Sequence, residues 1–149
     1  MGDAESACLP REPRQNPPVQ FTLEHIGLAA RDPAALKGWY ERVLGATVAF
    51  ANGATPPAFL LRLPAGLLLE IYPAASHRPE TADNTLAGLR HLALRVPSIE
   101  AAQSALAAHG VAFPDPIKPA GGGGRVLFFQ DPEGNLLHLV ERPADSPLA

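Results

Sequence analysis

Two histidines and two glutamates of the 149-residue chain stand at corresponding places in two similar halves. His25 and His91 lie within the first predicted strand of each half, and Glu70 and Glu141 end the last predicted strand. Neutral imidazole and carboxylate oxygen together suit a divalent cation. Four such ligands leave coordination positions for water or a substrate oxygen, on which the ion acts as a Lewis acid. The pattern therefore predicts an open, catalytic metal site.

Each of the four residues also has an ordinary interpretation. A histidine in a strand is most often a hydrogen-bonded structural residue, and a glutamate at a strand end is usually solvated. Glu70 is less ordinary, because it follows Leu67–Leu69 and precedes Ile71, and burying an unpaired carboxylate is costly. The sole cysteine, Cys8, excludes a cysteine-built zinc site. From the residues alone, a metal site and four structural roles remain open.

The elements that must position these side chains form an internal repeat. LEHIGL at 23–28 returns as LRHLAL at 89–94, and a repeat of this kind indicates two copies of one structural unit. Each strand precedes a predicted helix: one begins at Asp32-Pro33 and ends at Gly45, and the other begins at Ser98 and ends at His109-Gly110. Further strands are predicted at 46–51, 58–63, 67–72, 111–113, 125–130 and 136–141.

The predicted fold is accordingly α+β, with two β-α-β-β-β modules that curl as a mixed sheet around one cavity. We expect an extended or disordered arm at 1–19, a single domain at 20–143 and a tail at 144–149 that frays. Within the domain, module one spans 20–75 and module two spans 86–143, with a polar loop between them.

Composition excludes several function classes. A net charge of −3, from 12 basic and 15 acidic residues, offers no basic surface for nucleic acid. No apolar run approaches the ~20 residues that span a bilayer, and the first 20 residues do not resemble a signal peptide. We expect a cytoplasmic protein whose partner is a small molecule.

Three segments carry a resemblance to a known family. HIGLAARDPAALKGWYERVLG, RHLALRV and FFQDPEGNLLHLVER resemble the opening strand and helix, the second-module start and the closing hairpin of the vicinal oxygen chelate superfamily. That family includes glyoxalase I, bleomycin-resistance proteins and extradiol dioxygenases. The resemblance covers about residues 20–143. It implies the paired-module fold, a homodimer and a divalent ion (Ni, Zn, Co, Mn or Fe) held by His25, Glu70, His91 and Glu141.

The two-His, two-Glu set is most similar to that of bacterial glyoxalase I, a lactoylglutathione lyase. The resemblance implies isomerase or lyase chemistry on a small oxygen-chelating substrate through a metal-stabilised enediolate. Glu141 would be the catalytic base and Glu70 the second catalytic carboxylate. Ala29 stands where glyoxalase I typically has an arginine that helps to hold glutathione, so the resemblance does not extend to glutathione. The substrate-binding residues are unknown.

Two other functions remain open. A bleomycin-resistance type of protein would sequester a ligand without chemistry, although such proteins usually lack the metal ligands. An extradiol dioxygenase would use two histidines and one carboxylate, and Glu70 argues against it.

The remaining features have mostly structural interpretations. Trp39 and Tyr40 are expected in the core, and Gly121–Gly124 is expected to be a plain loop or a lid. His138 alternates with Leu137 and is expected to point away from the metal. Four arginines are expected at the surface or opposite an anionic substrate: Arg31, Arg62, Arg95 and Arg125.

Overall fold

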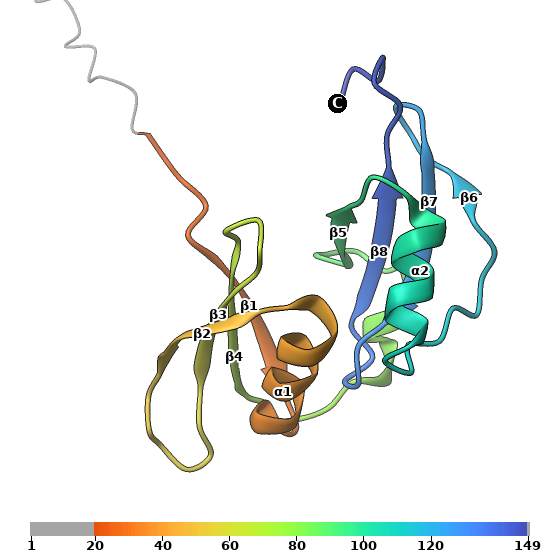
Figure 1. Ribbon diagram of the computed structural model, residues 1–149. Helices are drawn as coiled ribbons and strands as arrows, with labels where there is room; N and C mark the ends of the chain where they lie inside the picture. Colours follow the sequence, from red (N-terminus) through yellow and green to blue (C-terminus); the bar gives the residue numbers. More distant parts are fainter. Residues whose placement is uncertain (1–19, 149) are drawn as a thin grey trace, which may run out of the picture.

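Two four-stranded sheets, each with one helix, make up the computed structural model, which describes residues 20–148 (Figure 1). The first module contains β1 (His25–Ala30), α1 (Pro33–Leu44), β2 (Thr47–Ala51), β3 (Phe59–Arg62) and β4 (Leu68–Pro73). The short 3₁₀ helix η1 (Pro79–Ala82) lies in the linker. The second module contains β5 (His91–Arg95), α2 (Ile99–Ala107), β6 (Lys118–Pro119), β7 (Arg125–Gln130) and β8 (Leu136–Glu141).

The two sheets have the same topology, so the predicted α+β fold with a repeated module is confirmed. The strand order is β1-β4-β3-β2 in the first sheet and β5-β8-β7-β6 in the second. In each sheet the first strand pairs in parallel with the last, and the remaining pairs are antiparallel. The first strand of each module, β1 or β5, therefore lies at a sheet edge.

Both helices begin where the sequence predicts; α1 also ends as predicted, whereas α2 ends at Ala107, before the predicted end at His109-Gly110. The Asp32 carboxylate accepts a hydrogen bond from the Ala35 backbone N–H at 2.9 Å, and Gly45 ends α1 in the left-handed conformation. Ser98 caps α2 through the Ala101 backbone N–H at 3.2 Å. Tyr40 is fully buried and Trp39 packs against the core, as predicted.

Side-chain alternation divides each sheet into a core face and an open face. In β4, Leu69 and Ile71 are fully buried, and in β8, Leu137 and Leu139 are buried in the same way. These residues belong to one apolar core that also contains Leu36 of α1 and Ile99 of α2. Burial of this core face fixes the strand register, because a shift by one residue would exchange the two faces.

The turn between β7 and β8 joins the modules. Glu133 accepts hydrogen bonds from the Arg31 side chain at 2.8 Å and from the Arg31 and Asp32 backbone N–H groups at 3.0 and 3.2 Å. The Tyr40 hydroxyl donates to the buried Asp131 carboxylate at 3.1 Å. In Figure 1 this turn reaches down beside α1. The modules therefore meet through this turn and the β1–α1 corner.

One predicted strand of the second module is absent from the structure. Residues 111–113 form no strand, and the edge of the second sheet is the two-residue β6 instead. Within the predicted tail, Ser146 donates to the Gly122 carbonyl, and just before the tail Arg142 donates to the Gly121 and Gly123 carbonyls. These hydrogen bonds tie the backbone of Gly121–Gly123 to the chain that follows β8. The predicted arm, with Cys8, lies outside the described residues.

No helix between residues 20 and 148 has the length and apolar character needed to cross a membrane.

Candidate functional site

The first pair of predicted ligands meets on the open face of the first sheet. His25 and Glu70 come from the adjacent strands β1 and β4, and the His25 Nε2 atom lies 3.6 Å from the Glu70 carboxylate. Both side chains are accessible, with exposed fractions of 37% and 41%. The His25 Nδ1 atom lies 2.8 Å from the Glu24 carboxylate. Because a carboxylate accepts, Nδ1 donates this bond, and in the neutral ring Nε2 then has the lone pair that a metal ion needs.

A glycine keeps the space beside this pair open. Gly27 is the register partner of Glu70, and a Cβ at this position would lie 3.2 Å from the Tyr72 ring and 3.8 Å from the Glu70 carboxylate. A larger residue at position 27 would therefore displace the aromatic ring that borders Glu70.

The second module presents two histidines in the corresponding place. His91 of β5 and His138 of β8 have ring centroids 4.6 Å apart, and the Phe128 ring packs against both. The His91 Nδ1 atom lies 2.9 Å from the Asn84 side-chain oxygen. An amide oxygen can only accept, so the His91 Nδ1 atom donates this bond, and in the neutral ring its Nε2 atom has the lone pair. Glu24 and Asn84 therefore orient the first-strand histidines of the two modules.

The imidazole of His138 is partly buried, and one of its ring nitrogens has no hydrogen-bond partner among the described residues. Its Nδ1 atom is buried and has no hydrogen-bond partner within residues 20–148. Burial, together with the neighbouring His91 and Arg142, lowers the pKa of His138 to about 4. The ring is therefore neutral at physiological pH, which is the form that binds a cation. The expectation that His138 points away from this site is wrong.

Glu141 does not join His91 and has a structural role. It shares the alternation of Leu137 and Leu139, so it lies on the face covered by α2. Its carboxylate accepts a hydrogen bond from the Ile99 backbone N–H at 2.9 Å and pairs with Arg125 at 2.9 Å. The Ile99 bond and Arg125 lower the pKa of Glu141. Glu141 thus satisfies the first turn of α2.

The sequence already indicates that His138 and Glu141 lie on opposite faces of β8. In β4 the buried residues are Leu69 and Ile71, so Glu70 alternates onto the open face. In β8 the same rule places His138, and not Glu141, on the open face, because Leu137 and Leu139 are the core residues. Counting from the strand end alone therefore selected a side chain on the core face. Glu24 and Asn84 had no recognisable sequence signal.

The two pairs remain separate within one chain. Among residues 20–148, no group of three or more His, Cys, Asp or Glu side chains lies close enough to hold one ion. The cavity predicted to contain all four ligands is therefore not assembled by this single chain. Each open face instead carries two candidate ligands: a His–Glu pair and a His–His pair, which we call half-sites. Their donor atoms, imidazole nitrogen and carboxylate oxygen, fit a divalent transition-metal ion.

Three of the four arginines expected at the surface or opposite an anionic substrate have partners within the described residues. Arg125 pairs with Glu100 and Glu141, and Arg95 donates to the Leu148 carbonyl. Arg31 pairs with Glu133 at 2.8 Å, but its side chain remains 54% exposed.

Comparison with known proteins gives a consistent family. Residues 22–139 match the profile of the Glyoxalase/Bleomycin resistance protein/Dioxygenase superfamily. No curated protein sequence matches the chain significantly.

Solved structures of similar fold come from several bacteria. A glyoxalase family protein from Enterococcus faecalis is 28% identical, covers 80% of this chain and 97% of its own, and has a TM-score of 0.69. A fosfomycin resistance protein, FosX, from Listeria monocytogenes is 20% identical, with 87% and 97% coverage and a TM-score of 0.66. That FosX structure is a complex with Mn(II) and 1S,2S-dihydroxypropylphosphonic acid. A superfamily member from Sphaerobacter thermophilus is 21% identical, with 83% and 98% coverage and a TM-score of 0.63.

Proposed function

Because the chain belongs to the glyoxalase/bleomycin resistance protein/dioxygenase superfamily, we propose that it is a metal-dependent, glyoxalase-like enzyme that works as a homodimer. Its substrate would be a small molecule that chelates through two oxygens, and the reaction would be an isomerisation or a lyase reaction. The observation that carries the proposal is the pair of half-sites, each oriented by its own hydrogen-bond acceptor.

The proposed ligands are His25, Glu70, His91 and His138. Two features support His138 in place of the originally predicted Glu141: the unpartnered Nδ1 atom and the contact with His91. Glu141 already has two partners on the other face. Nickel, zinc, cobalt, manganese and iron all accept mixed imidazole and carboxylate ligands, so the set does not select one of them.

The proposed homodimer would bring a His25–Glu70 half-site against the His91–His138 half-site of a second copy. Each half-site adjoins a sheet edge, β1 or β5. Leu23 and Leu89, each two residues before the histidine, are 74% and 68% exposed. Unpaired edges beside exposed leucines are surfaces that proteins normally cover. Pairing of β1 with a second copy's β5 would cover both and complete two equivalent sites.

A bound divalent ion would polarise the substrate oxygens and stabilise negative charge that develops on them. Glu70 is the only carboxylate of the proposed set, so it takes the role of general base that the family resemblance assigned first to Glu141. Glu70 would remove a proton from the carbon beside the substrate carbonyl and return it to the neighbouring carbon. Gly27 leaves room for substrate at this carboxylate. Glutathione is not required by the proposal, because Ala29 offers no cation there.

The proposal is tested by metal analysis of protein purified without chelators, followed by titration of the stripped protein with Ni(II), Co(II), Zn(II) and Mn(II). Each loaded form is assayed with methylglyoxal, with and without glutathione, and with other 2-oxoaldehydes. We expect about one divalent ion per chain and turnover that disappears on chelation. Absence of binding with all four metals contradicts the proposal.

The other functions give different results in the same experiment. A ligand-sequestering protein would bind its ligand equally well after the metal is removed. An extradiol dioxygenase would consume oxygen with a catechol and Fe(II). Either result would replace the isomerase or lyase assignment.

A further inference from the structure

A cationic hollow lies where the linker after β4 crosses the end of β1, apart from the four proposed ligands. Its walls come from β1 and the residue that follows it, the linker, η1 and the β7–β8 turn. The side chains in its walls that can donate a hydrogen bond to an anion are Arg31, Ser76, His77, Arg78, Thr81 and Asn135. A guanidinium offers several N–H donors in a planar fork that matches an oxyanion.

Among the described residues that line the hollow, the one carboxylate already accepts hydrogen bonds. Glu133 is 11% exposed and accepts the Arg31 side chain and two backbone N–H groups. These donors outweigh the effect of burial and lower the pKa of Glu133. Arg78 has no side-chain hydrogen bond or ion pair with any residue between 20 and 148, and it is exposed. The hollow therefore carries one positive charge that Glu133 does not neutralise.

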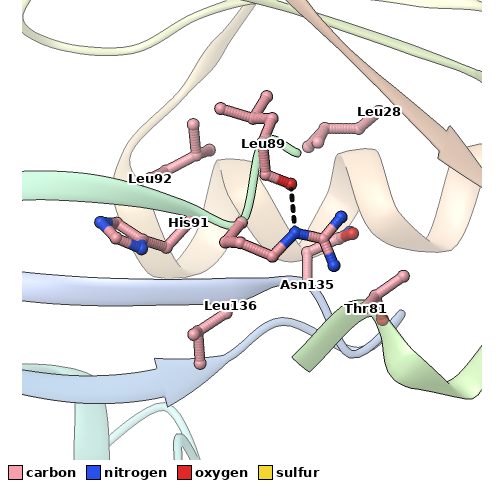
Figure 2. A pocket seen from close by; sticks show the side chains of 8 residues that line it. Leu28, Thr81, Leu89, His91, Leu92, Asn135 and Leu136 are labelled. Carbon is pink, nitrogen blue, oxygen red and sulfur yellow. Dashed lines mark hydrogen bonds between the residues drawn. The ribbon is translucent and has the colours of Figure 1, made fainter. Parts of the chain in front are cut away.

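A second, more apolar hollow adjoins the first. Leu28, Leu89 and Leu92 line it together with His91, and it shares Thr81 and Asn135 with the cationic hollow. Figure 2 shows His91 on one side of this hollow and Thr81 and Asn135 on the other. Arg90 lines the apolar hollow and, with Arg78, a third hollow beside η1. The two hollows, one with His91 and the other with Arg78, therefore lie side by side and share Thr81 and Asn135.

We infer that the Arg31–Arg78 hollow binds an oxyanion, either a phosphoryl or phosphonyl group or a carboxylate. The oxyanion would be carried by the substrate at the end remote from its chelating oxygens. Anion binding here follows from the residues that line the hollow, whereas the role of the hollow for the substrate rests on the proposed function. The substrate class is thereby narrowed to elongated molecules with an apolar middle and an anionic end.

The test uses the stripped, metal-free full-length protein labelled with ¹⁵N. Amide shifts are followed during titration with sodium phosphate, and separately with sodium acetate, at constant ionic strength. We expect saturable shifts at Ser76, Arg78 and Thr81. In Arg78→Gln the affinity should fall about tenfold, because a charge-assisted hydrogen bond is lost. The matched control is Arg42→Gln, which removes an exposed α1 arginine that lines none of these hollows.

The two probes distinguish the sources of the oxyanion. Tighter binding of phosphate supports a phosphoryl or phosphonyl end, and equal or tighter binding of acetate supports a carboxylate end. Shifts that do not saturate, or equal affinity in Arg78→Gln and wild type, overturn the site. A failure of the proposed function appears separately, as loss of metal binding while phosphate binding persists.

Discussion

The core faces of the two modules are equivalent, whereas their open faces carry different side chains. Leu69 and Leu137 are fully buried at equivalent places in β4 and β8. On the open faces, the first module presents an accessible His25–Glu70 pair, whereas the second presents His91 against a partly buried His138. The second module's glutamate, Glu141, lies instead at the start of α2. The repeat thus preserves packing, while the chemistry of each open face is set by single residues.

The largest expected effect separates the two glutamates. Glu70→Gln should reduce turnover about 10²–10⁴-fold, because a general base and a charged ligand are both lost. Glu141→Gln should leave turnover within about threefold and lower the melting temperature instead, because the Ile99 N–H and Arg125 lose a charged acceptor. The measurements are kcat with saturating metal and thermal unfolding of the same preparations. Equal loss of turnover in the two variants would return Glu141 to the site.

The two glutamates also separate what the sequence predicts from what it does not. The repeat, both helices with their caps and the core residues follow from local signals: Asp32-Pro33, Gly45 and the alternation of Leu69 with Ile71. The proposed ligand His138 did not follow from the sequence, because the position of Glu141 at the strand end was given more weight than its alternation with Leu137 and Leu139. Separation of the half-sites could not be predicted, since it depends on how the β7–β8 turn holds the β1–α1 corner.

The core faces should respond equally. Leu69→Ala and Leu137→Ala should each lower the free energy of unfolding by about 2–5 kcal/mol, because each removes a fully buried side chain. Denaturant unfolding of both variants measures this cost. If one variant loses less than about 1 kcal/mol, the two core faces are not equivalent and the comparison between the modules fails.

A smaller effect is expected where the modules touch. The pKa of Glu133 is lowered in the folded chain: burial works against this shift, and the Arg31 side chain and the Asp32 and Arg31 backbone N–H groups outweigh it. The stabilisation is therefore complete above the unfolded pKa, near 4.5, and is lost as the pH falls through the lower folded value. Glu133→Gln should cost about 1–2 kcal/mol at pH 7 and progressively less below pH 4.5.

Unfolding free energies measured from pH 7 to pH 3 test this pH dependence. Asp145→Asn is the matched control, because Asp145 is exposed and its side chain has no hydrogen bond or ion pair within residues 20–148. A cost of Glu133→Gln that does not change with pH would mean that the carboxylate charge does not hold the modules together.

The central claim is that one metal site needs half-sites from two copies, and mixing two inactive variants tests it most directly. In Glu70→Gln the first half-site is defective, and in His91→Ala the second is defective. Random pairing after co-refolding makes about half of the dimers mixed, each with one intact site, so about a quarter of the wild-type metal binding should return. Metal bound per chain, measured at a concentration where neither variant alone retains the ion, reports the result. No recovery after subunit exchange would contradict a site shared between two copies.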